Sequence, residues 1–207
     1  PSLPDVALRV RDAIADAACD NRRIADLLAV DPSLAAKIIK IANSPLCRGN
    51  STVVDLRDAV SRIGLHTVGE LVICFSLKDL FNPDTPALRD RFSELVGEAV
   101  RVGACASVIG QRIGGLAEQA LLAGLLSNIG AFALLERLAL HPELLDDPGR
   151  VERALATYAP RVGGLICRNW ALGDAMEVAV VNALDWQFTP GPGDTLAAVV
   201  VLARYHT

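Results

Sequence analysis

The chain has 207 residues, of which 52% are hydrophobic, 21% charged and only 4% aromatic, so we expect a water-soluble globular protein with a sizeable core. Its formal net charge of −4 and its few aromatic side chains argue against nucleic acid as a partner. Proteins bind phosphate backbones through basic surfaces and bind unpaired bases by stacking them on aromatic side chains.

Helical patterns fill the first third of the chain. Apolar residues recur at helical spacing over residues 6–17 and again over 24–28. Asp31 followed by Pro32 predicts a helix start, because the carboxylate accepts hydrogen bonds from free amides and the proline needs no N–H there. This helix should end before Pro45, since the residue preceding a proline is pushed out of helical geometry.

The next helix is predicted to begin at Asp55 and to end at Gly64, and another follows over residues 68–75. Residues 82–86 (NPDTP) then form the strongest helix-breaking segment in the interior. We therefore expect one domain, 1–207, with an N-terminal helical lobe of about 1–81 and a second lobe of about 87–207. The lobes should share apolar surface, because the stripe at 68–75 lacks a sufficient partner inside the first lobe.

The second lobe is also predicted to be helical throughout. We expect helices over 87–113, 118–139, from Asp147 to about Tyr158, from Pro160 to Trp170, over 174–185, and from the cap at Asp194 onward. The apolar runs are bounded by helix caps and not by hairpin turns. The predicted fold class is all-α, without significant β-sheet.

The five cysteines are odd in number and form no C-x-x-C pair, which is typical of reduced thiols in the cytoplasm. The N-terminus shows no signal-peptide pattern. The apolar run over 120–135 is interrupted by polar residues and is shorter than the roughly 20 residues that span a bilayer. We therefore expect a cytoplasmic protein with no membrane partner.

Residues 124–130 (GLLSNIG) are the most informative segment. They resemble the Gly-Leu-Leu-His-Asp-Ile-Gly segment of the HD superfamily of metal-dependent phosphohydrolases, whose adjacent His and Asp hold a divalent metal that activates water. Ser127 and Asn128 stand at the positions of that pair. A neutral hydroxyl and a neutral amide are poor substitutes for imidazole and carboxylate. We interpret them as a degenerate HD pair and expect no catalytic residue, no metal site and no cofactor.

Further motifs resemble the HDOD family, the HD-related output domains. They are residues 31–44 (DPSLAAKIIKIANS), 58–64 (DAVSRIG), 124–130, and Val162-Gly163 followed by 169–172 (NWAL). The resemblance spans essentially the whole chain. It implies an all-helical bacterial signalling module that generally lacks phosphohydrolase activity and is often fused to other signalling domains. Histidines that many relatives carry are matched here by Ala159, Ala183 and Leu184.

The predicted function is a non-catalytic regulatory module that contacts signalling proteins or flanking domains of its own chain. Two alternatives stay open: a sensor of a nucleotide or second messenger that uses the vestigial pocket near Ser127 and Asn128, and a phosphohydrolase whose metal ligands lie elsewhere. Asn43 and Ser44 are candidate interaction residues, although the favoured interpretation is that they satisfy the end of their helix and begin the loop.

Overall fold

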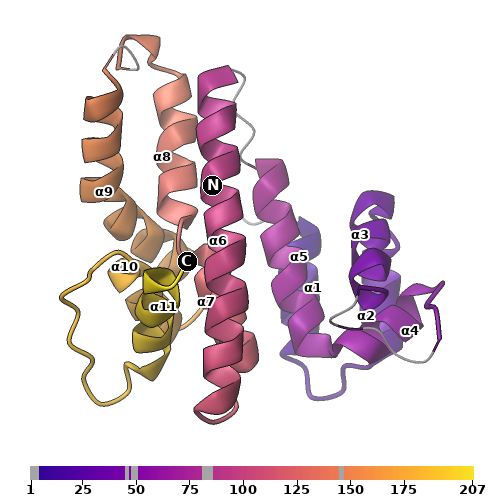
Figure 1. Ribbon diagram of the computed structural model, residues 1–207. Helices are drawn as coiled ribbons and strands as arrows, with labels where there is room; N and C mark the ends of the chain where they lie inside the picture. The colour runs from indigo at the N-terminus through magenta and orange to yellow at the C-terminus, as the bar shows by residue number, and fades with distance from the viewer. Residues whose placement is uncertain (1–4, 45–46, 48–50, 81–85, 145–146) are drawn as a thin grey trace. The chain divides into compact units, whose positions relative to one another are not determined.

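The computed structural model describes residues 5–44, 47, 51–80, 86–144 and 147–207 (Figure 1). Throughout these residues the backbone forms helices and connecting turns without a strand, which confirms the all-α prediction. The helices group into two compact units, one ending at Leu80 and the other at Thr207. Residues 82–85 of the predicted break lie outside the described residues, and the expectation that two lobes share apolar surface stays a prediction.

The first unit contains five helices: α1 (Asp5–Ile14), α2 (Asn21–Leu28), α3 (Pro32–Ala42), α4 (Leu56–Ile63) and α5 (Leu65–Leu80). Helix α1 packs against α2 and α5, and α4 packs against α2 and α3. Their apolar faces meet in a core of fully buried side chains: Val10, Ile24, Leu28, Ile38, Val60, Val68 and Val72. The helical spacing of these residues in the sequence is what places them on inward faces.

The helix starts predicted at Asp31 and Asp55 are confirmed. The Asp31 carboxylate accepts hydrogen bonds from the backbone N–H groups of Ser33 (2.9 Å) and Leu34 (3.0 Å). The Asp55 carboxylate accepts one from the N–H of Asp58 at 2.8 Å. Gly64 ends α4 with a φ of +92°, a conformation that favours glycine.

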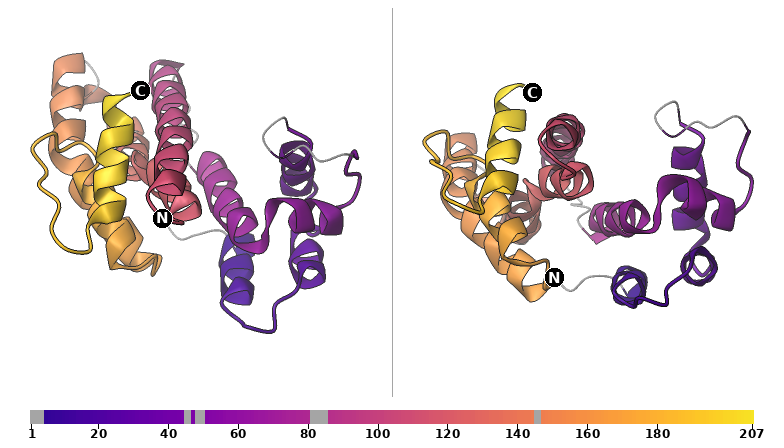
Figure 2. Two further views of the ribbon diagram at one scale, coloured as in Figure 1. Left: turned by 60° about the horizontal axis from the view of Figure 1, so that its bottom comes forward. Right: turned by 90° about the horizontal axis from the view of Figure 1, so that it is seen from below.

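The second unit contains α6 (Pro86–Arg112), α7 (Ala117–Leu126), α8 (Ile129–Ala139), a 3-10 turn (Pro142–Leu144), α9 (Pro148–Asn169), α10 (Asp174–Asn182) and α11 (Thr195–Tyr205). Helix α6 packs along α7 and α11, while α9 packs on α8 and α10. Figure 2 shows α11, in yellow, beside α6. The candidate site lies entirely within this unit.

Glycines allow two very close helix contacts on either side of the α7–α8 turn. A Cβ atom on Gly124 would lie 2.5 Å from the Cα of Gly103, where α7 crosses α6. A Cβ atom on Gly130 would lie 1.9 Å from the carbonyl oxygen of Ala159, where α8 meets α9. The glycines of the 124–130 segment are therefore packing requirements, and they hold the turn at Ser127 and Asn128 between two tight crossings.

The prediction of a single helix over 118–139 is wrong. Helix α7 ends at Leu126 and α8 begins at Ile129. The Ser127 N–H bonds the Gly124 carbonyl at 3.2 Å, an i→i−3 bond that tightens the last turn, and Asn128 has left helical geometry with φ −103° and ψ 9°. The polar pair thus forms a turn.

Helix α9 corrects a second boundary, because it runs through Pro160 instead of ending near Tyr158. Proline has no N–H, so the hydrogen bond that residue 160 would donate to the Ala156 carbonyl is lost. Packing on α8 and α10 offsets this loss, which amounts to roughly 3 kcal/mol for a proline inside a helix.

Two smaller expectations also change. Asp194 precedes α11 as predicted, but its carboxylate accepts a hydrogen bond from the Gly191 N–H (2.9 Å) and makes no cap bond to the helix. Helix α10 ends at Asn182, three residues earlier than expected.

The stretch Ala117–Ala139, which comprises α7 and α8, is long and apolar enough by composition to cross a membrane. This stretch is longer than the apolar run that we predicted over 120–135. Because 67% of its most apolar window is buried inside the protein, the stretch also matches a core helix, and it is weak evidence for a membrane span.

Candidate functional site

Ser127 and Asn128 lie in the turn between α7 and α8, and both are buried. Only 7% of Ser127 and 3% of Asn128 is exposed to solvent. A buried hydroxyl and a buried amide need hydrogen-bond partners, since an unpaired polar group costs about 1–3 kcal/mol. Their partners define the candidate site.

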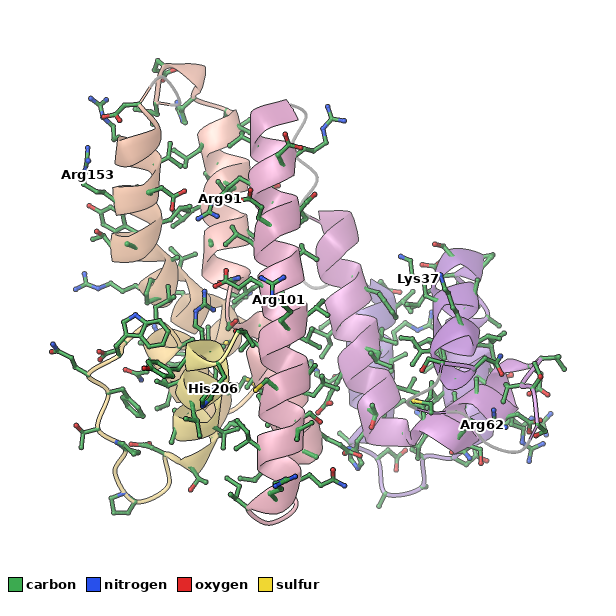
Figure 3. All side chains as sticks on the ribbon, in the orientation of Figure 1. Lys37, Arg62, Arg91, Arg101, Arg153 and His206 are labelled. Carbon is green, nitrogen blue, oxygen red and sulfur yellow. The ribbon has the colours of Figure 1, made fainter. Side chains whose placement is uncertain are left out.

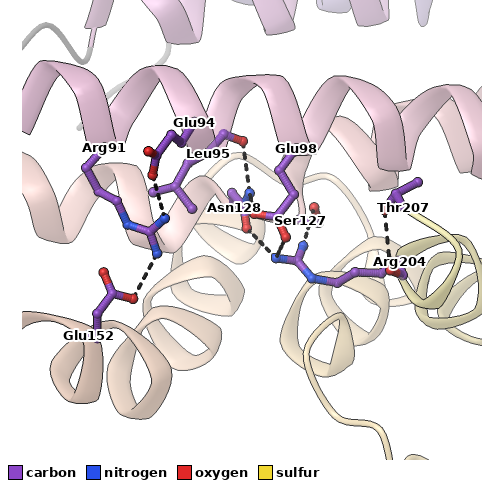
Figure 4. A network of polar contacts seen from close by, with 9 residues as sticks. All are labelled: Arg91, Glu94, Leu95, Glu98, Ser127, Asn128, Glu152, Arg204 and Thr207. Atoms are coloured by element: carbon purple, nitrogen blue, oxygen red, sulfur yellow. Dashed lines mark hydrogen bonds and ion pairs between the residues drawn. The ribbon is translucent and has the colours of Figure 1, made fainter. Parts of the chain in front are cut away.

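The guanidinium of Arg204, from α11, contacts both residues (Figure 4). Its Nη1 donates to the Ser127 Oγ at 3.2 Å, and its Nη2 donates to the Asn128 Oδ1 at 3.1 Å. The same Nη2 lies 2.7 Å from the Oε1 of Glu98, a residue of α6. One cation therefore joins α11 to α6 and to the α7–α8 turn.

The amide nitrogen of Asn128 completes the network. Its Nδ2 donates to the backbone carbonyl of Leu95 at 3.0 Å and to the Glu98 Oε2 at 3.2 Å. The side chain thus accepts from Arg204 with its oxygen and donates to two oxygens with its nitrogen. An aspartate, which only accepts when ionised, cannot make this set of bonds.

Arg204 is 8% exposed, so its charge is largely removed from water. Burial lowers the pKa of the Arg204 guanidinium, and the nearby Glu98 carboxylate opposes that shift. An arginine keeps its proton in proteins, so the group stays a cation at neutral pH. The site therefore carries one buried positive charge paired with one carboxylate.

A cavity of about 270 Å³ adjoins this network. It is bounded by α6, the α7–α8 turn, α8, α9, α10 and α11. Its apolar lining residues are Leu95, Ala131, Leu155, Ala156, Ala159, Pro160, Val180 and Leu184. The polar lining residues are Arg91, Glu98, Ser127, Asn128, Glu152 and Arg204.

A second arginine, Arg91 of α6, also borders the cavity. Its Nη1 lies 3.0 Å from the Glu94 carboxylate and its Nη2 lies 2.8 Å from the Glu152 carboxylate. Burial lowers the pKa of Arg91, but these two ion pairs outweigh burial and raise the pKa above its ordinary value. By contrast, Arg153 lies on the outer side of α9 (Figure 3). Both cavity arginines are thus already matched by carboxylates.

The structure brings two of the three family-matched positions to the same cavity. Ala159 and Leu184 line the cavity together with Ser127 and Asn128. Ala183, the residue before Leu184, is fully buried and does not line the cavity. The pair also has charged neighbours, because Arg204 contacts both of its residues and Glu98 contacts Asn128.

These residues do not fit a divalent metal. Ser127 and Asn128 offer neutral oxygens, Glu98 is the one carboxylate that touches them among the residues that the structure describes, and the Arg204 cation lies within hydrogen-bond distance of all three. Catalytic metal sites need three or more ligands that converge on an open position. Across the part of the chain that the structure describes, no group of three or more His, Cys, Asp or Glu residues is placed to hold a metal ion.

Asn43 and Ser44 lie in the other unit, at the end of α3. The Asn43 Nδ2 donates to the carbonyls of Ile39 (3.1 Å) and Val53 (2.8 Å), and its Oδ1 accepts from the Val53 N–H at 2.9 Å. The backbone N–H of Ser44 bonds the Ile41 carbonyl. Asn43 therefore ties the helix end to the following loop, while an interaction role for this pair stays a prediction.

Glu98 and Arg204 were not predicted from the sequence as site residues. A signal for Arg204 was present, because it is the only charged residue in the otherwise apolar helix α11. Glu98 lies next to the buried positions of α6, between Leu95 and Ala99. The contact between the two residues could not be predicted from the sequence, since they lie 106 positions apart in the chain.

The four cysteines with described side chains are all free thiols. Burial raises the pKa of the Cys167 thiol to about 12, with the Glu177 charge adding to the shift and Arg168 opposing it. A thiol that stays protonated is a poor nucleophile, so Cys167 has the properties of a packing residue.

Solved structures share this fold. A candidate metal-dependent phosphohydrolase from Shewanella amazonensis matches with a TM-score of 0.83 and 23% identity, over 98% of this chain and 76% of its own. An HDOD domain protein with unknown function from Geobacter sulfurreducens matches with a TM-score of 0.76 and 25% identity, over 100% of this chain and 72% of its own. A candidate signal transduction protein from Marinobacter aquaeolei matches with a TM-score of 0.69 and 23% identity, over 99% of this chain and 48% of its own.

No curated protein matches the chain. The HDOD domain family matches residues 1–185, a segment that includes the Ser127-Asn128 pair and ends before α11. Since this match covers most of the sequence, the chain belongs to the HDOD domain family.

Proposed function

We propose that this HDOD domain is a non-catalytic regulatory module of bacterial signal transduction. The proposal rests on the hydrogen bonds made by the degenerate HD pair. Ser127 and Asn128 are hydrogen-bonded to Arg204, and Asn128 also to Glu98, so the side chains at the metal-binding positions of HD enzymes are engaged within the protein. A fold that keeps the HD frame without its metal ligands is suited to act through its surface.

The proposed partners are signalling proteins or flanking domains of the same chain. A candidate signal transduction protein of similar fold is about twice as long as the matched segment, since this chain covers 48% of it. We also propose a cytoplasmic location, because the described cysteines are unpaired, as in a reducing compartment.

The catalytic half of this proposal is tested by hydrolysis assays. Purified protein is incubated with phosphomonoesters and with cyclic dinucleotides, with and without added Mn²⁺ or Mg²⁺. We expect no product above that of a heat-unfolded sample. Metal-dependent turnover that rises with protein concentration would contradict the proposal.

The signalling half is tested by in-cell crosslinking followed by reconstitution. Proteins crosslinked to the chain are identified by mass spectrometry, purified and titrated against it by calorimetry. We expect at least one of them to be a signalling protein that binds directly. If no purified candidate binds, the chain does not act as the proposed interaction module.

A second candidate function is a small-molecule sensor, favoured by the cavity beside Arg204 and Arg91. It comes second because the cavity volume of about 270 Å³ lies just below the usual range for ligand pockets, roughly 300–1,000 Å³. Nucleotides and second messengers can be screened by melting, because a ligand that binds only the folded state raises the melting temperature.

A further inference from the structure

Three oxygen atoms from two parts of the second unit, the α7–α8 turn and α6, converge on one guanidinium. They are the Ser127 Oγ at 3.2 Å, the Asn128 Oδ1 at 3.1 Å and the Glu98 Oε1 at 2.7 Å from the nearest Arg204 nitrogen. Figure 4 shows Arg204 extending from α11 toward all three. Two of these oxygens belong to the residues that stand in place of the metal-holding His and Asp of HD enzymes.

An ordinary buried ion pair would need only Glu98 and Arg204. Here the cation also satisfies both members of the degenerate pair, and Asn128 is oriented with its oxygen toward Arg204 and its nitrogen toward Glu98 and Leu95. Oxygen atoms that surround one positive charge are the arrangement that a bound cation would also impose. The Arg204 side chain is 5% exposed, so water does not screen this charge effectively.

We propose that Arg204 is a built-in cation that replaces the divalent metal of HD enzymes, and that it holds α6, the α7–α8 turn and α11 together as a metal would. The replacement comes from a helix beyond residues 1–185, the segment matched by the family. This inference goes beyond the proposed function, because it concerns what stabilises the site and not what the surface binds.

The proposal has a consequence that a simple structural ion pair lacks. Removing the guanidinium would leave a carboxylate, an amide oxygen and a hydroxyl facing a space without their cation. Such oxygens suit Mg²⁺ and Mn²⁺, and Mn²⁺ binds more tightly than Mg²⁺ at most oxygen sites. The variant should therefore gain a dependence on metal that the natural protein does not have.

The experiment measures melting temperature as a function of MnCl₂ for the natural protein, Arg204→Ala and Arg204→Ala with Glu98→Gln. We expect Arg204→Ala to melt several degrees lower than the natural protein and to regain part of the loss with MnCl₂, with one Mn²⁺ bound per chain by electron paramagnetic resonance. The natural protein should not respond. The double variant should not regain stability, because its carboxylate is gone.

The matched control is Arg153→Ala, which removes an exposed arginine of α9 paired with Asp147. It should melt like the natural protein and should not respond to MnCl₂. If Arg204→Ala does not fold alone, refolding with and without MnCl₂ replaces the melting curve, and recovery of helical signal only with metal supports the proposal.

Two results would overturn the inference. The first is an Arg204→Ala variant that MnCl₂ neither stabilises nor helps to refold. The second is an equal response in the double variant, which would place the bound metal elsewhere. Both results are independent of hydrolysis and partner binding, so they leave the proposed function to its own tests.

Discussion

The Asn128 side chain both donates and accepts hydrogen bonds in the network around Arg204. Its nitrogen faces two oxygens, the Leu95 carbonyl and the Glu98 carboxylate, while its oxygen faces Arg204. An amide presents a donor and an acceptor in one planar group, whereas an ionised carboxylate presents acceptors alone. An asparagine in place of the aspartate of the HD motif therefore matches the donors and acceptors that surround position 128.

Asn128→Asp should destabilise the protein by about 1–3 kcal/mol, because a carboxylate oxygen would replace the donor that faces Leu95 and Glu98. Urea unfolding followed by circular dichroism measures the change. The loss should shrink as the pH falls, since the introduced carboxyl group can donate a hydrogen bond once it is protonated.

The control for that substitution is Asn169→Asp, an exposed residue at the end of α9, which should change stability by no more than about 0.5 kcal/mol. Equal stability of Asn128→Asp and the natural protein would show that the hydrogen bonds donated by the Asn128 amide do not stabilise the fold.

Asn43→Ala should also destabilise, by about 1–3 kcal/mol, because it removes three hydrogen bonds to Ile39 and Val53 and leaves buried Val53 without partners for its backbone. Ser44→Ala is the matched control and should stay within about 0.5 kcal/mol. Thermal melting of both variants is the measurement. An unchanged melt of Asn43→Ala together with weaker partner binding would instead identify Asn43 as an interaction residue.

At the scale of helices, the glycines of α7 and α8 decide where the site can form. Gly124 meets Gly103 of α6, and Gly130 meets Ala159 and Gly163 of α9, at distances that leave no room for a side chain. These crossings set the positions of the two helix ends that flank Ser127 and Asn128. The network with Arg204 thus depends on backbone contacts that involve no polar side chain.

Gly130→Ala should therefore prevent normal packing of α8 on α9 and destabilise by more than about 3 kcal/mol, because backbone atoms cannot move away as a flexible side chain can. Gly149→Ala is the control: its Cβ would lie 3.2 Å from the ends of the flexible Arg153 and Asp147 side chains. That variant should be neutral or slightly stabilising. Similar melting temperatures for the two variants would contradict the close α8–α9 contact.

For the whole molecule, we ask whether restoring the HD pair would be enough to create a catalytic metal site. Ser127→His with Asn128→Asp would introduce a His-Asp pair, yet Arg204 would still lie beside it, and the cavity residues Ala159 and Leu184 offer no metal ligand. Two ligands are too few for a catalytic metal, which also needs a supporting second shell.

The double variant should therefore bind no stoichiometric metal and hydrolyse no phosphomonoester or cyclic dinucleotide above the natural protein. Metal analysis and a hydrolysis assay with added Mn²⁺ test this outcome together. One tightly bound metal per chain with new turnover would mean that other residues supply the missing ligands, and the non-catalytic interpretation would be wrong.

The sequence alone determined the helical class and most helix starts. The caps at Asp31 and Asp55 act on amides two or three residues away, so their signal is local and can be read directly. Apolar spacing within a helix is equally local, and it correctly predicted the buried face that holds Val10 and Leu28. The motifs at 31–64 and 124–130 also indicated the family, because each is a short continuous segment.

Only the tertiary structure decided what surrounds the pair. The turn at Ser127 and the continuation of α9 through Pro160 both overrode local expectations, because packing between helices outweighs the preference of a single residue. Arg204 and Glu98 lie 106 positions apart, and no spacing rule joins residues at that distance. Their contact follows from α11 packing along α6, which brings the arginine of an otherwise apolar helix to the Glu98 carboxylate beside Asn128.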